Sequence, residues 1–335
     1  MVLQCAERLI AWPWRRRDGR LSKVLALAHS PNSTLTGIAF KVASVVIFLA
    51  MAALLKAAQG VPVGELAFFR SFFAIIPVVL FLAWRGELSS GVKTKYPLRH
   101  LGRGVAGTGG MMFGFYALTK LPFAEATTLN YATPLIIVVI SALFLDEVVR
   151  LYRWSAVLLG LVGVIIISWP RLTLLSSGVD QDAAIGVGAA LLACLFAAIA
   201  MVQVRKLVHT EKSATIVFYF SISSTVIALA TLPFGWVVPS QEQLIYLVTA
   251  GICGGIAQIL LTESYRRADM SVVAPFEYTS LIFSIGIGYF VFSDQPTWHV
   301  LFGGLIVVGS ALFVIYRERQ LGKAQPEKEM ATPQG

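Results

Sequence analysis

Long apolar runs separated by short polar stretches repeat along the chain from residue 36 to residue 316. A helix needs about 20 consecutive apolar residues to cross the hydrocarbon core of a bilayer, and these runs approach or exceed that length. They lack the amphipathic faces expected of helices in the core of a soluble protein. The pattern predicts an all-α polytopic membrane protein with ten transmembrane helices, near 36–57, 63–84, 99–119, 122–145, 152–169, 183–206, 214–235, 243–265, 269–292 and 298–316.

The composition supports this reading and limits the number of domains. Hydrophobic residues make up 57% of the chain and charged residues 13%, with a mean hydropathy of +0.75. Soluble domains carry about 25% charged residues. Ten spans with short loops use nearly all of the 335 residues, so we expect one membrane domain between two tails. These tails are a basic segment at 1–35 and a polar segment at 318–335, which we expect to be disordered.

The distribution of basic residues predicts the orientation in the membrane. A net charge of +9 would suggest a nucleic-acid partner in a soluble protein, but here Lys and Arg gather in loops and tails beside apolar runs. Cytoplasmic loops of membrane proteins are charged in this way. If both termini are cytoplasmic, the opposite side receives only Lys56, Lys120 and Arg171. We therefore expect an inner-membrane protein surrounded by lipid, with both termini cytoplasmic and no nucleic-acid partner.

The sequence lacks the motifs of enzymes, metal sites and ATP-driven pumps. Cys5, Cys194 and Cys253 are far apart and have no His at metal-ligand spacing, so we expect no metal and no disulfide. There is no H-E-x-x-H and no G-x-x-x-x-G-K-[ST], and the four histidines fall in loops or at the ends of spans. We therefore expect no catalytic residue, no cofactor and no direct use of ATP.

The second half of the chain repeats the first at a constant offset. The matching positions are Gly104 and Gly107 with Gly251 and Gly254, Asn130 and Tyr131 with Glu277 and Tyr278, and Glu147 with Asp294. Five spans in each copy are an odd number, so the two copies must have opposite orientations and equivalent loops should exchange their charge. The loop with Lys93 and Lys95 indeed matches 236–242, which contains no Lys or Arg. This predicts inverted repeats at 36–170 and 183–317, an arrangement typical of carriers.

Several segments, taken in order, resemble a known family. They are Glu65 to Arg70, Tyr116 to Ala126 and on to Glu147, Arg153 to Val157 and on to Gly163, and Ala274 to Tyr278 and on to Pro296. Their order and spacing resemble the EamA repeats of the drug/metabolite transporter (DMT) superfamily from about 36 to 317. Asp294 stands where the second repeat usually has Glu.

The resemblance implies a ten-helix fold made of two five-helix EamA-like halves, with a cavity between them and transport by alternating access. Members of the family carry amino acids, nucleosides, vitamins or S-adenosylmethionine, in either direction. The resemblance therefore names neither the substrate nor the direction of transport.

Ionisable side chains inside the spans are the first candidates for function, because a charge in hydrocarbon costs at least a few kcal/mol. Glu277 follows Pro275, which can loosen the ninth span. We interpret Glu277 as a proton-coupling or substrate-binding carboxylate, with a structural hydrogen-bonded glutamate as the alternative. Arg70 should find its counter-charge on another helix, at Glu125 or Glu277, and the pair is then either structural or functional. Lys41 is expected to snorkel to the interface.

Polar and aromatic residues of four spans can line a binding cavity for a planar or zwitterionic solute, although aromatic side chains at this depth also serve simple packing. They are Phe115, Tyr116, Asn130, Tyr131, Gln258 and Tyr278. The glycines of the third and eighth spans are better explained as close helix contacts.

The function predicted from the sequence is secondary transport of a small organic metabolite. A channel or a sensor is the alternative, and an intramembrane enzyme is a weaker one. Saturable flux that competitors inhibit would distinguish a carrier from a channel. Proton coupling, antiport and facilitated diffusion all stay open, as do a monomer and a homodimer.

Overall fold

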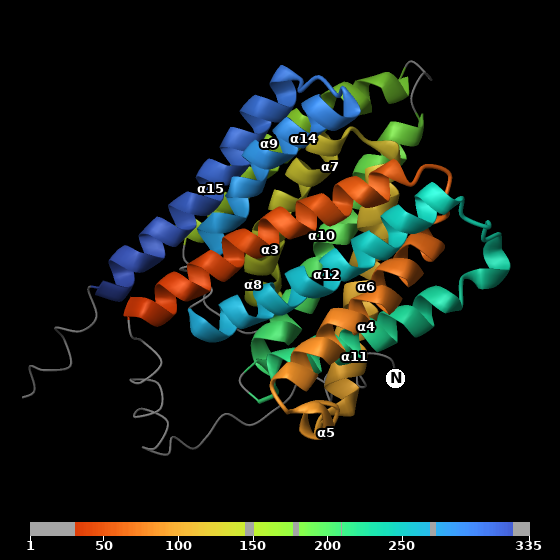
Figure 1. Cartoon of the computed structure of the whole chain (residues 1–335). Coiled ribbons are helices and arrows are strands. Elements are labelled where there is room, and N and C mark those ends of the chain that lie inside the picture. The colour runs from red at the N-terminus through yellow and green to blue at the C-terminus, as the bar shows by residue number, and fades with distance from the viewer. Residues whose placement is uncertain (1–30, 145–150, 177–180, 209, 269–272, 324–335) are drawn as a thin grey trace, which may run out of the picture.

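The computed structural model describes residues 31–144, 151–176, 181–208, 210–268 and 273–323. Within these ranges every regular element is an α-helix or a 3-10 helix, which confirms the all-α class. The long helices run side by side in one bundle (Figure 1). The helices α9 (Leu151–Ser176) and α15 (Trp298–Lys323) pack on each other on one side of the bundle (Figure 1). On the other side lie α4 (Val63–Trp84), α11 (Ser213–Leu229) and α12 (Gln241–Arg267).

The first half of the chain forms helices that start at local sequence signals. Pro62 precedes α4 in an extended conformation, and α6 begins at Pro97, where a missing N–H costs nothing. The elements of this half are α3 (Pro31–Ala57), α4 (Val63–Trp84), α5 (Leu88–Gly91), α6 (Pro97–Lys120), α7 (Phe123–Leu129), η1 (Asn130–Ala132), α8 (Thr133–Phe144) and α9 (Leu151–Ser176).

The second half has the same order of long elements. A capping box begins its third long helix, since Gln243 N–H donates to Ser240 Oγ at 3.2 Å and Ser240 N–H donates to Gln243 Oε1 at 2.8 Å. The elements are α10 (Gln181–Leu207), α11 (Ser213–Leu229), η2 (Leu232–Phe234), α12 (Gln241–Arg267), η3 (Ala274–Tyr278), α14 (Thr279–Phe292) and α15 (Trp298–Lys323).

The helices follow the predicted spans, but several extend beyond them: α3 begins at Pro31, inside the predicted tail 1–35, and α9 continues to Ser176. The helix α15 continues to Lys323, into the segment 318–335 that was expected to be disordered, so that expectation is wrong for its first residues. Most of the basic N-terminal tail, residues 324–335 and Glu147 lie outside the described residues.

Four helices of the described part are long and apolar enough to cross a bilayer: Leu35–Ala57, Val63–Trp84, Asp182–Leu207 and Gln241–Arg267. Four further apolar helices there are shorter, at Trp154–Ile167, Ser213–Leu229, Phe276–Phe292 and Trp298–Ser310. The fourth predicted span is divided among α7, η1 and α8, so no single helix carries its full apolar length. The count of ten spans therefore stays a prediction.

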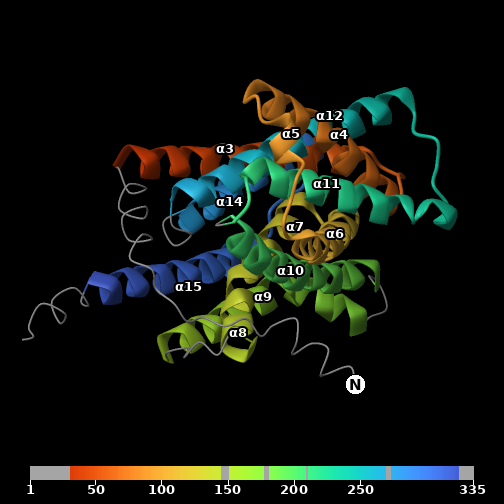
Figure 2. The ribbon, with the colours of Figure 1, turned by 90° about the horizontal axis from the view of Figure 1, so that it is seen from below.

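The packing pairs the helices in a regular way across the two halves. The helix α3 packs on α12 as α10 packs on α6, and α4 packs on α12 as α11 packs on α6. The remaining large contacts join α4 to α11 and α9 to α15, which are matching helices of the two halves, and α7 to α14, which do not match. Figure 2, which looks along a direction perpendicular to that of Figure 1, shows α3, α4, α11 and α12 together and α9, α10 and α15 on the opposite side.

Close contact between α4 and α12 depends on glycine. A Cβ atom added at Gly251 would lie 2.5 Å from Phe73 Cβ and 2.7 Å from the Phe69 carbonyl oxygen, and one at Gly255 would lie 2.6 Å from the Ala74 carbonyl oxygen. Backbone atoms cannot move aside cheaply. The structure therefore confirms the interpretation of these two glycines as helix contacts.

Candidate functional site

An ion pair joins the first helix to the ninth predicted span. The ammonium of Lys41 on α3 donates a hydrogen bond to Glu277 Oε2 in η3. The Lys41 side chain is 2% exposed and that of Glu277 is 46% exposed. The Lys41 ammonium also lies 5.6 Å from the ring centroid of Tyr265 on α12. The expectation that Lys41 snorkels is therefore wrong, because its charge is balanced inside the bundle by Glu277.

The local backbone around Glu277 is a 3-10 turn with a proline in its first turn. Such turns leave α-helical hydrogen bonds unmade, and nearby hydroxyl groups replace some of them. Ser280 Oγ donates to the Glu277 carbonyl at 2.6 Å, and Thr279 Oγ1 donates to the Phe276 carbonyl at 2.7 Å. The turn places Glu277 where α14 begins, as expected from the loosening effect of Pro275.

Two tyrosines that match in the repeat contact each other directly. The rings of Tyr131 in η1 and Tyr278 in η3 have centroids 5.3 Å apart and an interplanar angle of 67°. The Tyr131 hydroxyl is hydrogen-bonded to Ser280 Oγ at 2.6 Å. Both tyrosines are buried, and each lies in a 3-10 turn. The contact brings the matching turns of the two halves together, with Glu277 beside it.

Asn130, the match of Glu277 in the first half, is exposed. Its Oδ1 atom lies 3.9 Å from the thiol of Cys194 on α10. The equivalent turns therefore carry an amide in one half and a carboxylate paired with a lysine in the other.

Arg70 does not pair with either of the expected acids. Its side chain is 3% exposed, and no carboxylate of the described residues lies within ion-pair distance of it. Its guanidinium carbon lies 5.3 Å from the ring centroid of Phe220 on α11, a cation–π contact. Arg103 on α6, which is 6% exposed, lies 4.1 Å from the centroid of the same ring. The prediction that Glu125 or Glu277 balances Arg70 is wrong.

The other predicted lining residues lie in different surroundings. Phe115 is buried in a core cluster with Leu66 and Leu247. Tyr116 packs against the cluster that holds the two tyrosines of the repeat, and it also lines an apolar groove of about 520 Å³ with Phe113 and Ile185. Tyr116 therefore packs on the same core cluster as the two tyrosines, whereas Phe115 belongs to another cluster.

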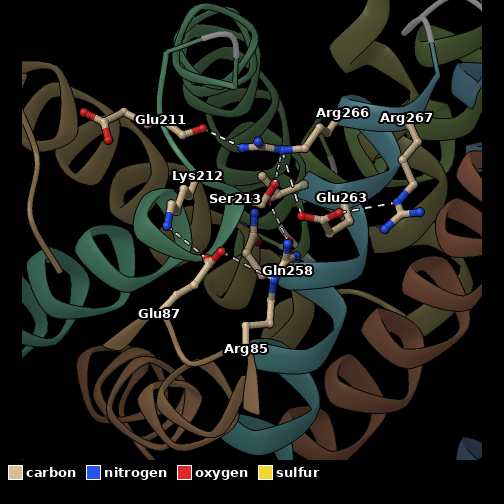
Figure 3. Close-up of polar contacts among 10 residues, drawn as sticks. Arg85, Glu87, Glu211, Lys212, Ser213, Gln258, Glu263, Arg266 and Arg267 are labelled. Atoms are coloured by element: carbon tan, nitrogen blue, oxygen red, sulfur yellow. Dashed lines mark hydrogen bonds and ion pairs between the residues drawn. The ribbon is translucent and has the colours of Figure 1, made fainter. Parts of the chain in front are cut away.

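A network of charged side chains joins the ends of three helices, α4, α11 and α12 (Figure 3). Glu87, just after α4, lies 3.2 Å from the ammonium of Lys212 before α11 and 3.9 Å from Arg85. The side chains border a hollow of about 320 Å³. Gln258, a predicted site residue, is buried beside this network on α12 (Figure 3).

The last turn of α12 supplies the rest of the network. Arg266 donates to Ser213 Oγ at 2.8 Å and to the Glu211 carbonyl at 2.5 Å. The Oε2 atom of Glu263 accepts a hydrogen bond from Arg267 Nε at 3.4 Å, and its Oε1 atom lies 3.9 Å from Arg266 Nε (Figure 3). These contacts connect α11 with α12. The network therefore holds the ends of α4, α11 and α12 next to one another.

Asp294 has a role at the other end of the bundle. Its Oδ2 atom accepts a hydrogen bond from the N–H of Phe123 at the start of α7, at 2.8 Å. An anion at a helix N-terminus is favoured by the helix dipole and by the unpaired N–H groups. Asp294, the conservative departure from the family pattern, thus connects the two halves of the chain. This contact links the end of the ninth predicted span with the start of the fourth.

Reasoning from the sequence missed three participants: Arg103, Tyr265 and Ser280. Arg103 lies inside the predicted span 99–119, so the rule that singled out Arg70 could have found it. Tyr265 and Ser280 carry no comparable signal, because only the packing of α12 and η3 brings them to the site.

Comparisons with known proteins place the chain among transporters. The sequence model of the EamA-like transporter family matches residues 35–169 and 184–316. The chain is 28% identical over 265 residues to an S-adenosylmethionine uptake transporter of Rickettsia felis, covering 79% of this chain and 87% of the relative. It is 29% identical over 275 residues to the pseudopaline exporter CntI of Pseudomonas aeruginosa, covering 82% and 93%.

A riboflavin transporter of Rhizobium johnstonii is 30% identical over 289 residues, covering 85% of this chain and 89% of the relative. A solved crystal structure shares the fold, with a TM-score of 0.63 at 21% identity over 88% of this chain and 99% of that chain. These named relatives are transporters and not enzymes, which confirms the expectation that this chain is not an enzyme. Together with the apolar helices, they identify a multi-pass membrane protein that handles a small molecule.

Proposed function

The chain belongs to the EamA-like transporter family, and from this premise we propose that it is a secondary transporter working by alternating access across the inner membrane. Its ten spans form an inverted repeat, with repeats at 36–170 and 183–317 and both termini in the cytoplasm. The substrate is a small organic metabolite such as an amino acid, a vitamin, a nucleoside or S-adenosylmethionine.

The contact between Tyr131 and Tyr278 is the observation that carries this proposal. Two matching residues can touch only near the axis that relates the two halves. Carriers with inverted repeats hold their substrate at this interface, where helices are interrupted near the middle of the membrane. Both tyrosines lie in such interruptions, and the Lys41–Glu277 pair is the adjoining charge.

The unequal burial of the ion pair suggests how Glu277 acts. Lys41 is sealed within the bundle, whereas almost half of the Glu277 side chain is exposed. A proton, or an ammonium or sulfonium group of a substrate, can therefore approach the carboxylate from its open side and compete with Lys41. Loss of the ion pair then frees α3 from η3, which links binding to helix movement.

The remaining predicted site residues have different roles in this transport function. Asn130, Tyr131 and Tyr278 line the site beside Glu277, and Tyr116 borders it. Gln258 lies next to the charged network of Figure 3, which closes the cytoplasmic end when the site faces the periplasm. Phe115 supports the fold, and Arg70 lies with Arg103 against the ring of Phe220.

Counterflow in proteoliposomes tests the proposal. Purified protein is reconstituted, preloaded with unlabelled S-adenosylmethionine, riboflavin or an amino acid, and assayed for uptake of the radiolabelled form. We expect saturable uptake of one class that unlabelled competitors inhibit. We also expect its loss in Glu277→Gln but not in Glu242→Gln, an exposed acid at the start of α12. Unsaturable flux would indicate a channel, and wild-type rates in Glu277→Gln would remove Glu277 from the site.

A further inference from the structure

Arg70 and Arg103 form a buried pair of guanidinium groups against one phenylalanine ring. In both side chains, Nε and Nη1 are sealed from solvent and have no hydrogen-bond partner among the described residues. We propose that these two arginines bind a carboxylate or a similar oxyanion group of the transported metabolite. This inference rests on the proposed transport function and narrows its substrate class to metabolites that carry such a group.

Burial without a partner is the first argument for an anion. A guanidinium has five N–H donors in a planar fork, and each donor that is buried without an acceptor is costly. The face of Phe220 attracts the positive charge but accepts no strong hydrogen bond. A carboxylate offers two oxygen atoms in the geometry that the guanidinium fork matches, and burial makes such a pair stronger than it is in water.

The balance of charge around the pair is the second argument. Neither arginine has a carboxylate of the described residues within ion-pair distance. The two arginines stay positive and repel one another across the same ring. One anion held by both would remove the repulsion and satisfy the buried donors together, whereas a neutral ligand would do neither.

Room for the two guanidinium groups comes from two glycines that match in the repeat. A Cβ atom at Gly107 on α6 would overlap Nη1 of Arg103. A Cβ atom at Gly254 on α12 would lie 3.0 Å from Nε of Arg70. Each guanidinium group therefore packs directly against the backbone of a helix. The two positive charges are therefore held in fixed, buried positions and do not belong to flexible surface side chains.

Ligand pairs that differ only in a carboxylate test the proposal. The thermal unfolding of the purified full-length protein is measured at constant ionic strength with S-adenosylmethionine, with its decarboxylated analogue, with amino acids and their decarboxylated amines, and with sodium sulfate. A ligand that binds only the folded protein raises the unfolding temperature. We expect stabilisation by a carboxylate-bearing metabolite, and about 10- to 100-fold weaker binding of its carboxylate-free counterpart, as loss of charge-assisted hydrogen bonds predicts.

Variants connect the effect to the arginines. Arg103→Gln should bind the carboxylate-bearing and carboxylate-free members of the pair equally weakly, whereas Arg99→Gln should keep the wild-type preference. Arg99 is a matched control because it lies on the same helix and also stacks on an aromatic ring, that of Tyr96 at 4.2 Å. If Arg103→Gln does not fold, Arg103→Lys keeps the charge but loses the fork. The comparison of ligand pairs on the wild-type protein needs no variant.

The possible results distinguish binding of a carboxylate by the two arginines from the alternatives. Equal binding of both members of every pair, or no stabilisation by any carboxylate-bearing probe, overturns the proposal. Stabilisation by sulfate alone makes the pair a site for an inorganic anion and also overturns it. Saturable counterflow of riboflavin, which has no carboxylate, with no uptake of carboxylate-bearing metabolites would leave the transport function intact while refuting this inference. Absence of saturable flux for every metabolite would instead refute the transport function.

Discussion

Removing Glu277 should destabilise the protein much more than removing Lys41, although each change breaks the same ion pair. The reason is that the two partners are buried to different degrees, 2% exposed for Lys41 and 46% for Glu277. Glu277→Gln leaves the Lys41 ammonium sealed in the bundle beside Tyr265, without its carboxylate partner. Lys41→Met leaves a carboxylate that can be solvated, and methionine retains most of the volume of the lysine stem.

The magnitudes follow from measured costs of breaking ion pairs. Removing one partner of a fully buried pair costs about 3 to 5 kcal/mol, and a solvent-exposed pair contributes about 0 to 1 kcal/mol. We therefore expect Glu277→Gln to lower the free energy of unfolding by about 3 kcal/mol and Lys41→Met by about 1 kcal/mol. The double variant has no unpaired buried charge and should also lose only about 1 kcal/mol, which gives a strong coupling in the double-mutant cycle.

Unfolding by SDS titration of the purified protein in mixed detergent micelles measures these differences. Glu242→Gln is the control for loss of an exposed acid and should unfold like the wild type. Equal losses for the two single variants would mean that Lys41 reaches water when its partner is absent. A double variant as unstable as Glu277→Gln would show that the glutamate stabilises the protein through contacts other than Lys41.

Three further predictions concern the helix contacts, the link between the halves and the orientation. Gly251→Ala should lower the free energy of unfolding by about 1 to 3 kcal/mol, because the added Cβ meets backbone and side-chain atoms of α4. Its control is Gly188→Ala, where an added Cβ would have no atom within 4 Å, and this change should be neutral or slightly stabilising in the same unfolding assay. Asp294→Ala should lower the free energy of unfolding by about 1.5 to 3 kcal/mol, since it leaves the N-terminus of α7 without its anionic acceptor. A smaller loss in Asp294→Asn would confirm that the charge contributes. Reporter fusions after Gly91 should give a cytoplasmic signal and fusions after Ser240 a periplasmic one, and the same compartment for both would contradict the inverted repeat.

The sequence by itself determined where the helices lie and how the halves correspond. Apolar length and proline positions act locally, so the start of α4 after Pro62 and the 3-10 turn beginning at Ala274 follow from neighbouring residues. The repeat also matched Tyr131 with Tyr278, and these two residues prove to be in contact. The duplication, which can be read from the sequence alone, makes these two residues equivalent, but only the packing of the two halves brings them into contact.

Only the tertiary structure decided which charges meet. Lys41 and Glu277 are 236 positions apart, and nothing in either segment indicates that α3 faces η3. Arg70 was predicted to find an acid because an unpaired arginine inside a membrane protein is costly, yet the packing of α4, α6 and α11 gave it a phenylalanine ring and a second arginine. Hydropathy places a charge at a depth in the membrane, but the rotation of each helix about its axis and the choice of its neighbour determine the partner of that charge.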